Sequence, residues 1–173
     1  MTKSIFKTER KENIKSKILK IGFHFHPAYR RTGGRVCFLS ADLKEVHIKL
    51  RLNWKTKNLM GTVFGGSIFG ALDPVYLTQL INILGKEYVV WDKSATINFI
   101  KPIKNTVFAR FIITDEQIDE IKTKIESKKK YTFNLTASFQ DQKGLTYAEM
   151  ARTIFVADRS YFNGLLKVRS KVR

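Results

Sequence analysis

Residues 58–85 read N-L-M-G-T-V-F-G-G-S-I-F-G-A-L-D-P-V-Y-L-T-Q-L-I-N-I-L-G, and this stretch decides the fold. It contains one charged side chain, Asp73, and it is apolar nearly all round from residue 67 to residue 84. A helix of this composition has no polar face to turn to water, so most of its surface must be buried. The stretch therefore predicts a central helix over residues 67–84, ended by Gly85.

The composition indicates one folded domain. The chain has 173 residues, 43% of them hydrophobic, and 13 are Phe, which is enough to bury a sizeable core. The single cysteine, Cys37, excludes an internal disulfide, so a reducing cytoplasm is the simplest location. Residues 1–20 carry Lys and Arg throughout and no continuous apolar run, unlike a signal peptide.

The net charge of +17 is concentrated at the two ends of the chain. Residues 1–35 have ten Lys or Arg against two acids, and residues 159–173 have five against none. The middle has 17 against 13, a balance of only +4. Such basic flanks can attract a membrane surface, nucleic acid or a phosphate-bearing ligand. Solubility alone is the simpler interpretation, and we favour it slightly.

The N-terminal flank has the pattern of an amphipathic helix over residues 5–25, ending before Pro27. Its apolar stripe consists of Ile14, Ile18, Ile21 and Phe25. A stripe of this kind can lie on a membrane surface, but more often it packs on its own domain, and we favour packing. The residues Arg30–Gly34 are expected to form a turn.

Strand patterns dominate the rest of the chain. They predict six strands, at residues 36–43, 46–52, 88–100, 107–113, 131–140 and 145–156. A short helix starts at Thr114, with Gln117 as its capping partner, between the fourth and fifth strands. One curved antiparallel sheet wrapped around the central helix is the packing that buries most of it, giving an α+β fold.

We therefore divide the chain into three parts. Residues 1–30 form a basic amphipathic helix that packs on the domain, residues 31–157 form the domain, and residues 158–173 form a basic tail. One sheet cannot cover a lone helix completely, so the remaining helix face is expected to meet a second copy of the chain. The expected assembly is a homodimer, or a tetramer built from it.

Asp73 and the glycines before it are the candidate functional residues. A carboxylate in apolar surroundings must be protonated, paired or used, because burying it bare costs roughly several kcal/mol. Gly65 and Gly66 precede it by a few residues, where the helix begins. Glycine lets a ligand approach the backbone, and the N–H groups of a helix N-terminus can stabilise an oxyanion. The alternatives remain a paired structural Asp73 and glycines that serve packing.

The quoted run resembles the helix-start motif of hotdog-fold acyl-CoA thioesterases, particularly the phenylacetyl-CoA thioesterase type. Asn58, Gly65, Gly66 and Asp73 stand at the spacings of that motif, and residues 94–102 resemble the strand that follows the hotdog helix. The likeness covers roughly residues 25–157 and is greatest to an uncharacterised branch of the superfamily, which shares Met-Gly-x-x-x-Gly-Gly and Val-Trp-Asp-Lys. It implies a six-stranded antiparallel sheet wrapped around a long helix.

The resemblance also implies a reaction, the hydrolysis of an acyl thioester carried on CoA or on acyl carrier protein, with no cofactor and no metal. Gly66 would supply the oxyanion site, Asn58 would hold the carbonyl or orient water, and Asp73 would act as general base or nucleophile. We expect the acyl group to be bound by Phe64, Gly65, Ser67, Ile68, Phe69, Tyr76 and Trp91. A non-catalytic acyl-binding protein and a purely structural dimerisation domain are the alternatives.

Two further points bear on that reaction. The motif of the relatives has a His where this chain has Phe64, and this difference favours the non-catalytic alternative. The seven residues from Gly66 to Asp73 span about 10 Å along a helix. Both groups should lie roughly 3 Å from the reacting centre. Asp73 is therefore expected to act with the Gly66 of a second protomer, whose helix runs antiparallel to its own.

Overall fold

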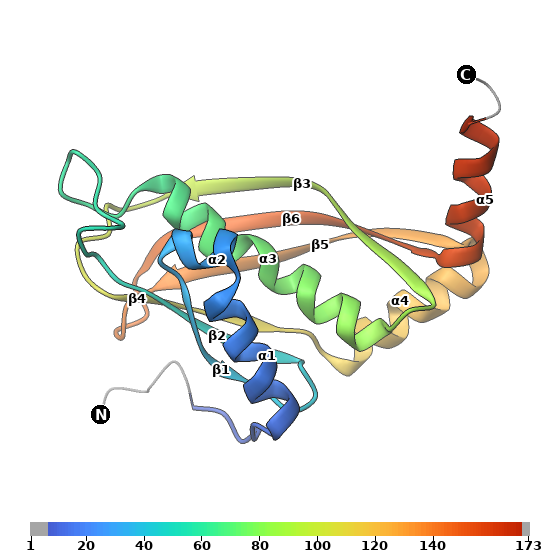
Figure 1. Cartoon of the computed structure of the whole chain (residues 1–173), viewed down its shortest axis with the longest axis horizontal. Coiled ribbons are helices and arrows are strands. Elements are labelled where there is room, and N and C mark those ends of the chain that lie inside the picture. Colours follow the sequence, from blue (N-terminus) through green and yellow to red (C-terminus); the bar gives the residue numbers. More distant parts are fainter. Residues whose placement is uncertain (1–6, 171–173) are drawn as a thin grey trace.

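A computed structural model describes residues 7–170 of the chain, which form five helices and six strands (Figure 1). In chain order these are α1 (Ile14–Phe25), α2 (Pro27–Thr32), β1 (Arg35–Leu39), β2 (Glu45–Leu50), α3 (Gly65–Leu84), β3 (Tyr88–Phe99), β4 (Val107–Ile112), α4 (Asp115–Lys128), β5 (Lys130–Gln140), β6 (Thr146–Asp158) and α5 (Arg159–Ser170). The six expected strands and both expected internal helices are present.

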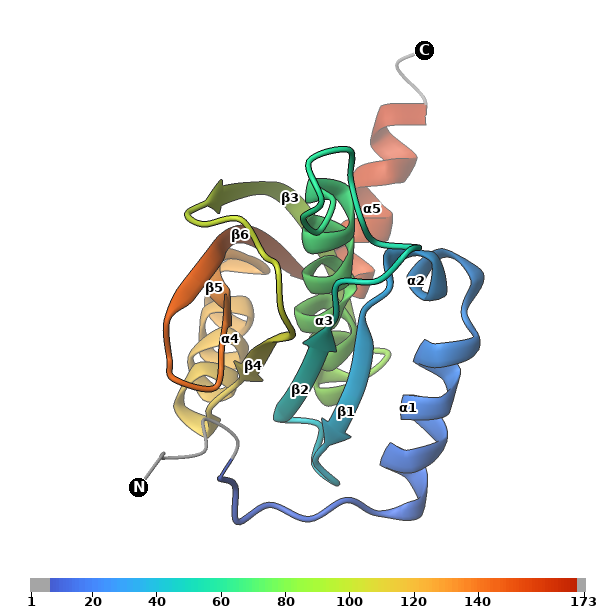
Figure 2. The ribbon, with the colours of Figure 1, turned by 90° about the vertical axis from the view of Figure 1, so that its left-hand side faces the viewer.

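The strands form one antiparallel sheet in the order β1-β2-β4-β5-β6-β3. The central helix α3 contacts β2 and β4 from one half of the sheet and β6 and β3 from the other. The sheet therefore curves around α3, as expected (Figure 2). Strands β1 and β3 are the two edges, and β3 is the longer of them, with 12 residues.

Helix α3 supplies the centre of the core. Ala71, Leu72, Val75 and Leu80 are completely buried, and each large side chain of this kind stabilises the fold by about 1.5–3 kcal/mol. Among the described residues α3 alone has the length and composition of a membrane span, and its place inside the sheet is that of a core helix. One face stays uncovered, because Phe69, Asp73 and Leu77 are only partly buried and Ile81 is exposed.

The N-terminal region differs from the expectation in two ways. Helix α1 begins at Ile14, because the side chain of Asn13 accepts a hydrogen bond from Ser16 N while Ser16 Oγ accepts one from Asn13 N. This capping box fixes the start of the helix. The expected turn at Arg30 is part of α2, which Gly33 ends in the left-handed conformation at φ +81°. Residues 1–6 lie outside the described residues.

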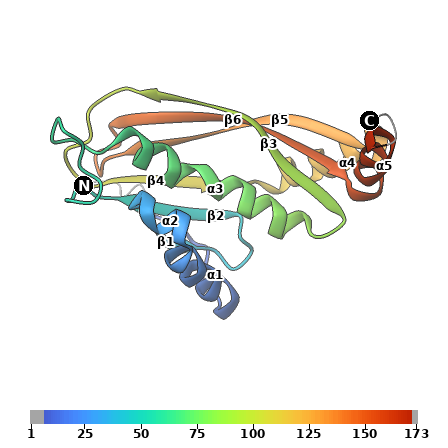
Figure 3. The same cartoon turned by 45° about the horizontal axis from the view of Figure 1, so that its top comes forward.

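Helix α1 lies beside β1 at the edge of the molecule (Figure 3). It faces the domain with Leu19 and Phe23, which pack against the core, and with Ser16, which is fully buried. The stripe that we expected to face the domain is on the opposite side of the helix and is exposed. Helix α1 is thus apolar on two opposite faces, and the sequence pattern alone did not reveal which of them would be buried.

The C-terminal flank, which the sequence marks as a basic tail, forms helix α5. Helix α5 starts after Asp158, whose side chain accepts hydrogen bonds from Tyr161 N and Ser160 Oγ. The helix lies at the end of the molecule opposite the loop before α3 (Figures 1 and 3). The end of the predicted tail, residues 171–173, falls outside the described part of the chain.

A buried polar cluster ties β2 to its neighbours. Glu45 and His47 are almost completely buried, and Glu45 Oε1 accepts hydrogen bonds from Arg110 Nε and from the His47 ring, each at 2.7 Å. Burial acts to raise the pKa of Glu45, but the bonds from Arg110, Thr8 and His47 outweigh it and hold that pKa below its ordinary 4.5. Burial lowers the pKa of His47 from its ordinary 6.5, against the opposing effect of Glu45.

These shifts predict an acid-sensitive fold. Below pH 6.5 the unfolded chain binds a proton at His47 more readily than the folded chain does. Below pH 4.5 the same holds for Glu45, so acid favours unfolding in both ranges. Glu45→Gln should lower the free energy of unfolding at pH 7 by about 1–3 kcal/mol, because Arg110 and His47 lose their charged partner. Urea denaturation from pH 7 to pH 4 measures both effects.

The matched control is Glu126→Gln, which removes a carboxylate from an exposed position on α4. This variant should unfold like the parent protein. An equal loss in the two variants would show that the cluster around Glu45 contributes nothing particular to stability.

Candidate active site

The first turn of α3 presents two unpaired backbone donors. Ser67 N and Ile68 N both donate to Phe64 O, and Phe64 N donates to Thr56 O. Within the described part of the chain, the N–H groups of Gly65 and Gly66 have no acceptor. They also lie at the positive end of a 20-residue helix. This turn can therefore hold a developing negative charge on a ligand oxygen.

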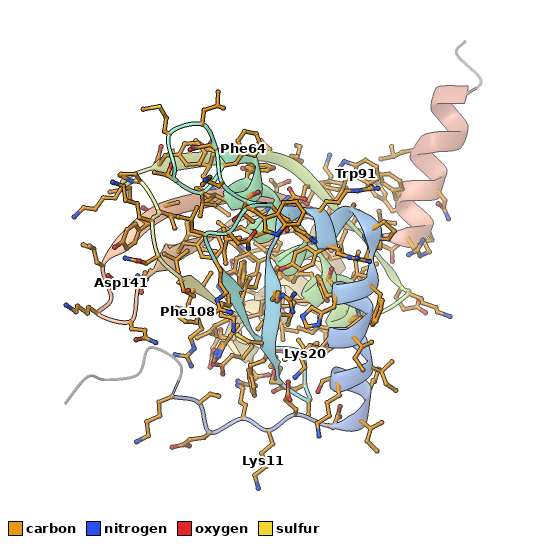
Figure 4. All side chains as sticks on the ribbon, turned by 60° about the vertical axis from the view of Figure 1, so that its left-hand side comes forward. Lys11, Lys20, Phe64, Trp91, Phe108 and Asp141 are labelled. Carbon is orange, nitrogen blue, oxygen red and sulfur yellow. The ribbon has the colours of Figure 1, made fainter. Side chains whose placement is uncertain are left out.

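Aromatic rings lie close to the backbone at both glycines. A Cβ on Gly65 would stand 3.2 Å from the ring of Phe99, and one on Gly66 would stand 2.4 Å from the ring of Phe64. The Phe64 ring thus lies against the turn itself. It is also more than half exposed, at the rim beside the loop that precedes α3 (Figure 4). A side chain at position 66 would displace that ring.

An open groove of about 250 Å³ runs along this turn. Three of the predicted site residues, Asn58, Gly65 and Ile68, line it. Its other wall comes from the end of β3 and the segment after it, including Phe99 and Lys101. The groove therefore joins the helix start to the following strand, and we call it the Asn58 groove.

Asn58 has a structural role that it can combine with a chemical one. Its Oδ1 accepts hydrogen bonds from Met60 N and Thr62 N, and its Nδ2 donates to Thr62 Oγ1 at 2.9 Å. These bonds shape the loop before α3, in which Gly61 takes φ +74°. An amide nitrogen carries two hydrogens, so one donor of Asn58 is left beside the groove.

Asp73 belongs to a second cluster, which also contains Arg152 and Asp92. Arg152 is 97% buried, and its Nη1 donates to Asp73 Oδ1 at 3.1 Å and also to Asp73 O. Its Nε and Nη2 bind the two oxygens of Asp92 at 3.2 and 2.5 Å. One buried guanidinium thus holds two carboxylates, one from α3 and one from β3.

Arg152 fixes Asp73 without enclosing it. The side chain of Asp73 is 44% exposed, and its Oδ2 has no partner among the described residues. One oxygen of Asp73 is therefore positioned by Arg152 while the other faces outward. Asp92 is more enclosed, and burial raises its pKa, with the charge of Asp73 adding to this effect and Arg152 opposing it. Of the two carboxylates, Asp73 is the one available to a ligand.

A β-bulge in β3 allows both Asp92 and Phe99 to face α3. Asp92 pairs with Ile154 and Ser94 pairs with Thr153, so Lys93 is an extra residue in the ladder. Asp92 and Phe99 are seven residues apart, and in a regular strand an odd separation puts two side chains on opposite faces. With the bulge, both side chains face α3, where Asp92 meets Arg152 and Phe99 meets Gly65.

The other residues predicted to bind the acyl group lie in several different places. Tyr76 is buried in the core, where its hydroxyl donates to Thr136 O at 2.8 Å and burial raises its pKa to about 12. Ser67 is also buried, and Phe69 lies on the partly uncovered face of α3. Trp91 is exposed on the side of β3 that faces away from α3, since its neighbour Asp92 points inward. Tyr76 and Trp91 therefore do not border the Asn58 groove.

Arg152 was not among the residues predicted for the site, although its sequence context carries a signal. It stands between Met150 and Ile154 at a buried position of β6, where the period-2 pattern calls for an apolar side chain. An arginine at such a position needs a buried carboxylate. Asp92, four residues after the start of β3, is one of the two carboxylates that pair with Arg152. Its neighbour Lys93 instead lies over the ring of Phe155.

The chain matches a family model over most of its length. The model is described as Domain of unknown function (DUF4442) and matches residues 15–156. The chain belongs to the DUF4442 family. No curated protein matches this DUF4442 protein. In its described part, no three His, Cys, Asp or Glu side chains are grouped so as to hold a metal ion.

Solved structures show that this DUF4442 protein has the hotdog fold. PA5026 of Pseudomonas aeruginosa, named a probable thioesterase, is 17% identical, with a TM-score of 0.74 over 86% of this chain and 99% of that one. Thioesterase HI1161 of Haemophilus influenzae is 11% identical, with a TM-score of 0.61 over 87% and 96%. The phenylacetic acid degradation protein PaaI of Thermus thermophilus is 18% identical, with a TM-score of 0.51 over 75% and 97%. At these identities the likeness establishes the fold alone.

Because Arg152 pairs with both Asp73 and Asp92, we expect its replacement to affect stability strongly. Arg152→Gln should lower the free energy of unfolding by about 3 kcal/mol or more, because it leaves Asp92 and Asp73 beside each other without a countercharge. Denaturant unfolding at pH 7 measures the loss. Arg35→Gln, at an exposed position of β1, removes the same group as a control and should cost little. A small loss for Arg152→Gln would mean that solvent already compensates both carboxylates.

Proposed function

We propose that this protein hydrolyses acyl thioesters, with Asp73 and the first turn of α3 as the two halves of its site. The observation that carries the proposal is the state of Asp73, a carboxylate on an apolar helix with one oxygen fixed by Arg152 and the other open. The same helix begins with two unpaired N–H groups beside the Asn58 groove. A base and an oxyanion site are the two elements that this hydrolysis requires.

Two protomers are needed to combine these halves, because Gly66 and Asp73 of one helix lie about 10 Å apart along its axis. Strand β3 supports a dimer of the required kind. It is a long edge strand with exposed backbone, and such an edge is a template for pairing with a second copy. Pairing of β3 with its symmetry mate would bring two α3 helices side by side and antiparallel, with their uncovered faces toward each other.

The chemistry proceeds through a tetrahedral intermediate. Asp73 takes a proton from water, and the hydroxide attacks the thioester carbon while the carbonyl oxygen becomes an anion held by the partner's Gly66 N–H. When the C–S bond breaks, the proton passes to the thiol and a carboxylic acid remains. In the alternative route Asp73 Oδ2 attacks directly, and water then hydrolyses the resulting anhydride. Arg152 orients Asp73 in both routes.

The substrate class follows from the groove. Its lining combines Ile68, Phe99 and other apolar side chains with the exposed Lys101 at one edge. An acyl chain fits the apolar part, and a cation at the mouth suits the phosphate of CoA or of a carrier protein's phosphopantetheine arm. The cytoplasm, where both carriers are found, remains our expected location.

A non-catalytic acyl-binding protein is the second candidate, and Phe64 favours it. The Phe64 ring lies against Gly66, at the position where the thioesterase motif has a His. Most of the hydrogen-bonding capacity of Asn58 is also used within its own loop. A protein with this site could hold a thioester carbonyl and an acyl chain without activating water.

Turnover of a panel of acyl-CoAs separates the two candidates. Asp73→Asn should lower kcat by roughly a hundredfold or more with little change in KM, because the carboxylate acts on water rather than on substrate binding. Free thiol released from the CoA esters measures the rate. Asp119→Asn, on the surface of α4, is the control and should be fully active. Tight binding with no turnover by the parent protein would favour the binding protein instead.

Mixed dimers test whether each site contains residues of two protomers. Gly66→Ala should also be inactive, because its methyl group collides with the Phe64 ring. When the Asp73→Asn and Gly66→Ala proteins are unfolded together and refolded, half of the dimers are mixed. Each mixed dimer then has one intact site, which restores about a quarter of the parent activity. No recovery, with mixed dimers verified by mass, would place both groups of the site within one protomer.

A further inference from the structure

The outward face of α1 is an apolar stripe that nothing in the described chain covers. Ile14, Ile18, Ile21 and Phe25 are 53 to 79% exposed. Their spacing of four, three and four residues puts them in one row along the helix. The row lies opposite Leu19 and Phe23, which pack against the core. The stripe is thus a continuous apolar surface pointing away from the domain, unlike a scatter of single exposed side chains.

Positive charge surrounds this stripe. At 100° per residue Lys15 and Lys17 project on either side of it, and both are exposed. Arg30 and Arg31 follow on α2, and Arg35 opens β1. The sequence contains no acidic residue from 13 to 41. Among the described residues, these five cations form no ion pair.

A basic hollow of about 930 Å³ continues the same surface. Phe25, Arg30, Arg31, Arg35, Trp54 and Lys55 contribute to its lining. Trp54 is 82% exposed, and Lys55 Nζ lies 4.9 Å from the centre of its ring. The hollow therefore joins the end of the apolar stripe to an exposed tryptophan, with cations between them.

We propose that this surface docks on an anionic lipid bilayer. A helix with an apolar stripe and flanking lysines can lie in the plane of the membrane, with its stripe at the boundary of headgroups and acyl chains. Lipid phosphates would then meet the cations of the rim and hollow, and Trp54 would lie at the headgroup level, where tryptophan is enriched. The helix of 12 residues presents about 18 Å of such a stripe.

The composition of the surface argues against two other occupants. Nucleic acid would satisfy the cations, but it offers no apolar partner for a row of isoleucines. A second copy of the chain would satisfy the isoleucines, but a two-fold contact through the stripe would bring the cations beside one stripe close to those of the other, and residues 13–41 contain no acid to offset them. A bilayer that contains anionic lipid satisfies both parts of the surface. This proposal does not depend on thioester hydrolysis, although the loop that carries Trp54 also carries Asn58.

Vesicle flotation with the full chain tests the proposal. The protein should float with vesicles of phosphatidylcholine and phosphatidylserine and much less with phosphatidylcholine alone. Ile18→Asp should weaken its partitioning roughly tenfold or more, since it puts a charge where the stripe enters the lipid. Leu145→Asp, at an exposed position of the β5–β6 hairpin, should bind like the parent. Thermal unfolding at the parent midpoint would verify that both variants fold.

A second pair of variants isolates the charges. Lys15→Glu with Lys17→Glu should reduce binding to the anionic vesicles. Lys122→Glu with Lys143→Glu makes the same change of net charge at exposed positions elsewhere and should leave binding nearly intact. Three results would overturn the proposal: no flotation of the parent protein, equal flotation of Ile18→Asp, or equal losses in the two charge variants. Self-association abolished by Ile18→Asp without vesicle binding, or retention on RNA alone, would likewise refute it.

Discussion

The buried guanidinium of Arg152 must be paired with negative charge, and Asp73 of the central helix and Asp92 of β3 provide it. The ion pairs from β6 to Asp73 of α3 and Asp92 of β3 connect the helix to the last two strands of the sheet. A buried guanidinium is costly on its own, so these three residues depend on one another. The same bonds hold the Asp73 carboxylate with one oxygen unpaired within the described residues, so stability and the proposed chemistry depend on one set of contacts.

The sheet topology leaves surfaces of β3 and α3 uncovered. Strand β3 is both an edge and a wall of the Asn58 groove, and α3 keeps one face uncovered on its side that bears Asp73. The edge of β3 and the uncovered face of α3 differ from the outer face of α1, because that face is surrounded by positive charge. The molecule therefore has two distinct surfaces available for association, one suited to a copy of itself and one to an anionic, partly apolar partner.

The sequence predicted the architecture because the strongest signals concern burial. An all-apolar helix and six strands can pack together in few ways. The capping box predicted from Thr114 and Gln117 is present in the structure. The candidate site was harder to predict from the sequence. The contact of Arg152 with Asp73 joins residues 79 positions apart, and no local pattern encodes it. The orientation of α1 was also ambiguous, because Leu19 and Phe23 form a second apolar row that competes with the stripe for the domain.

The bulge at Lys93 restricts how this chain can change in length. Its extra residue sets which side of β3 every later side chain occupies, up to Phe99. Loss of one residue from this segment would keep both Asp92 and Phe99 toward α3 only if the bulge were lost with it, because six residues of regular strand place two side chains on one face. Related chains with seven residues from the carboxylate to the aromatic residue therefore need a bulge in this strand, whereas chains one residue shorter can have a regular ladder.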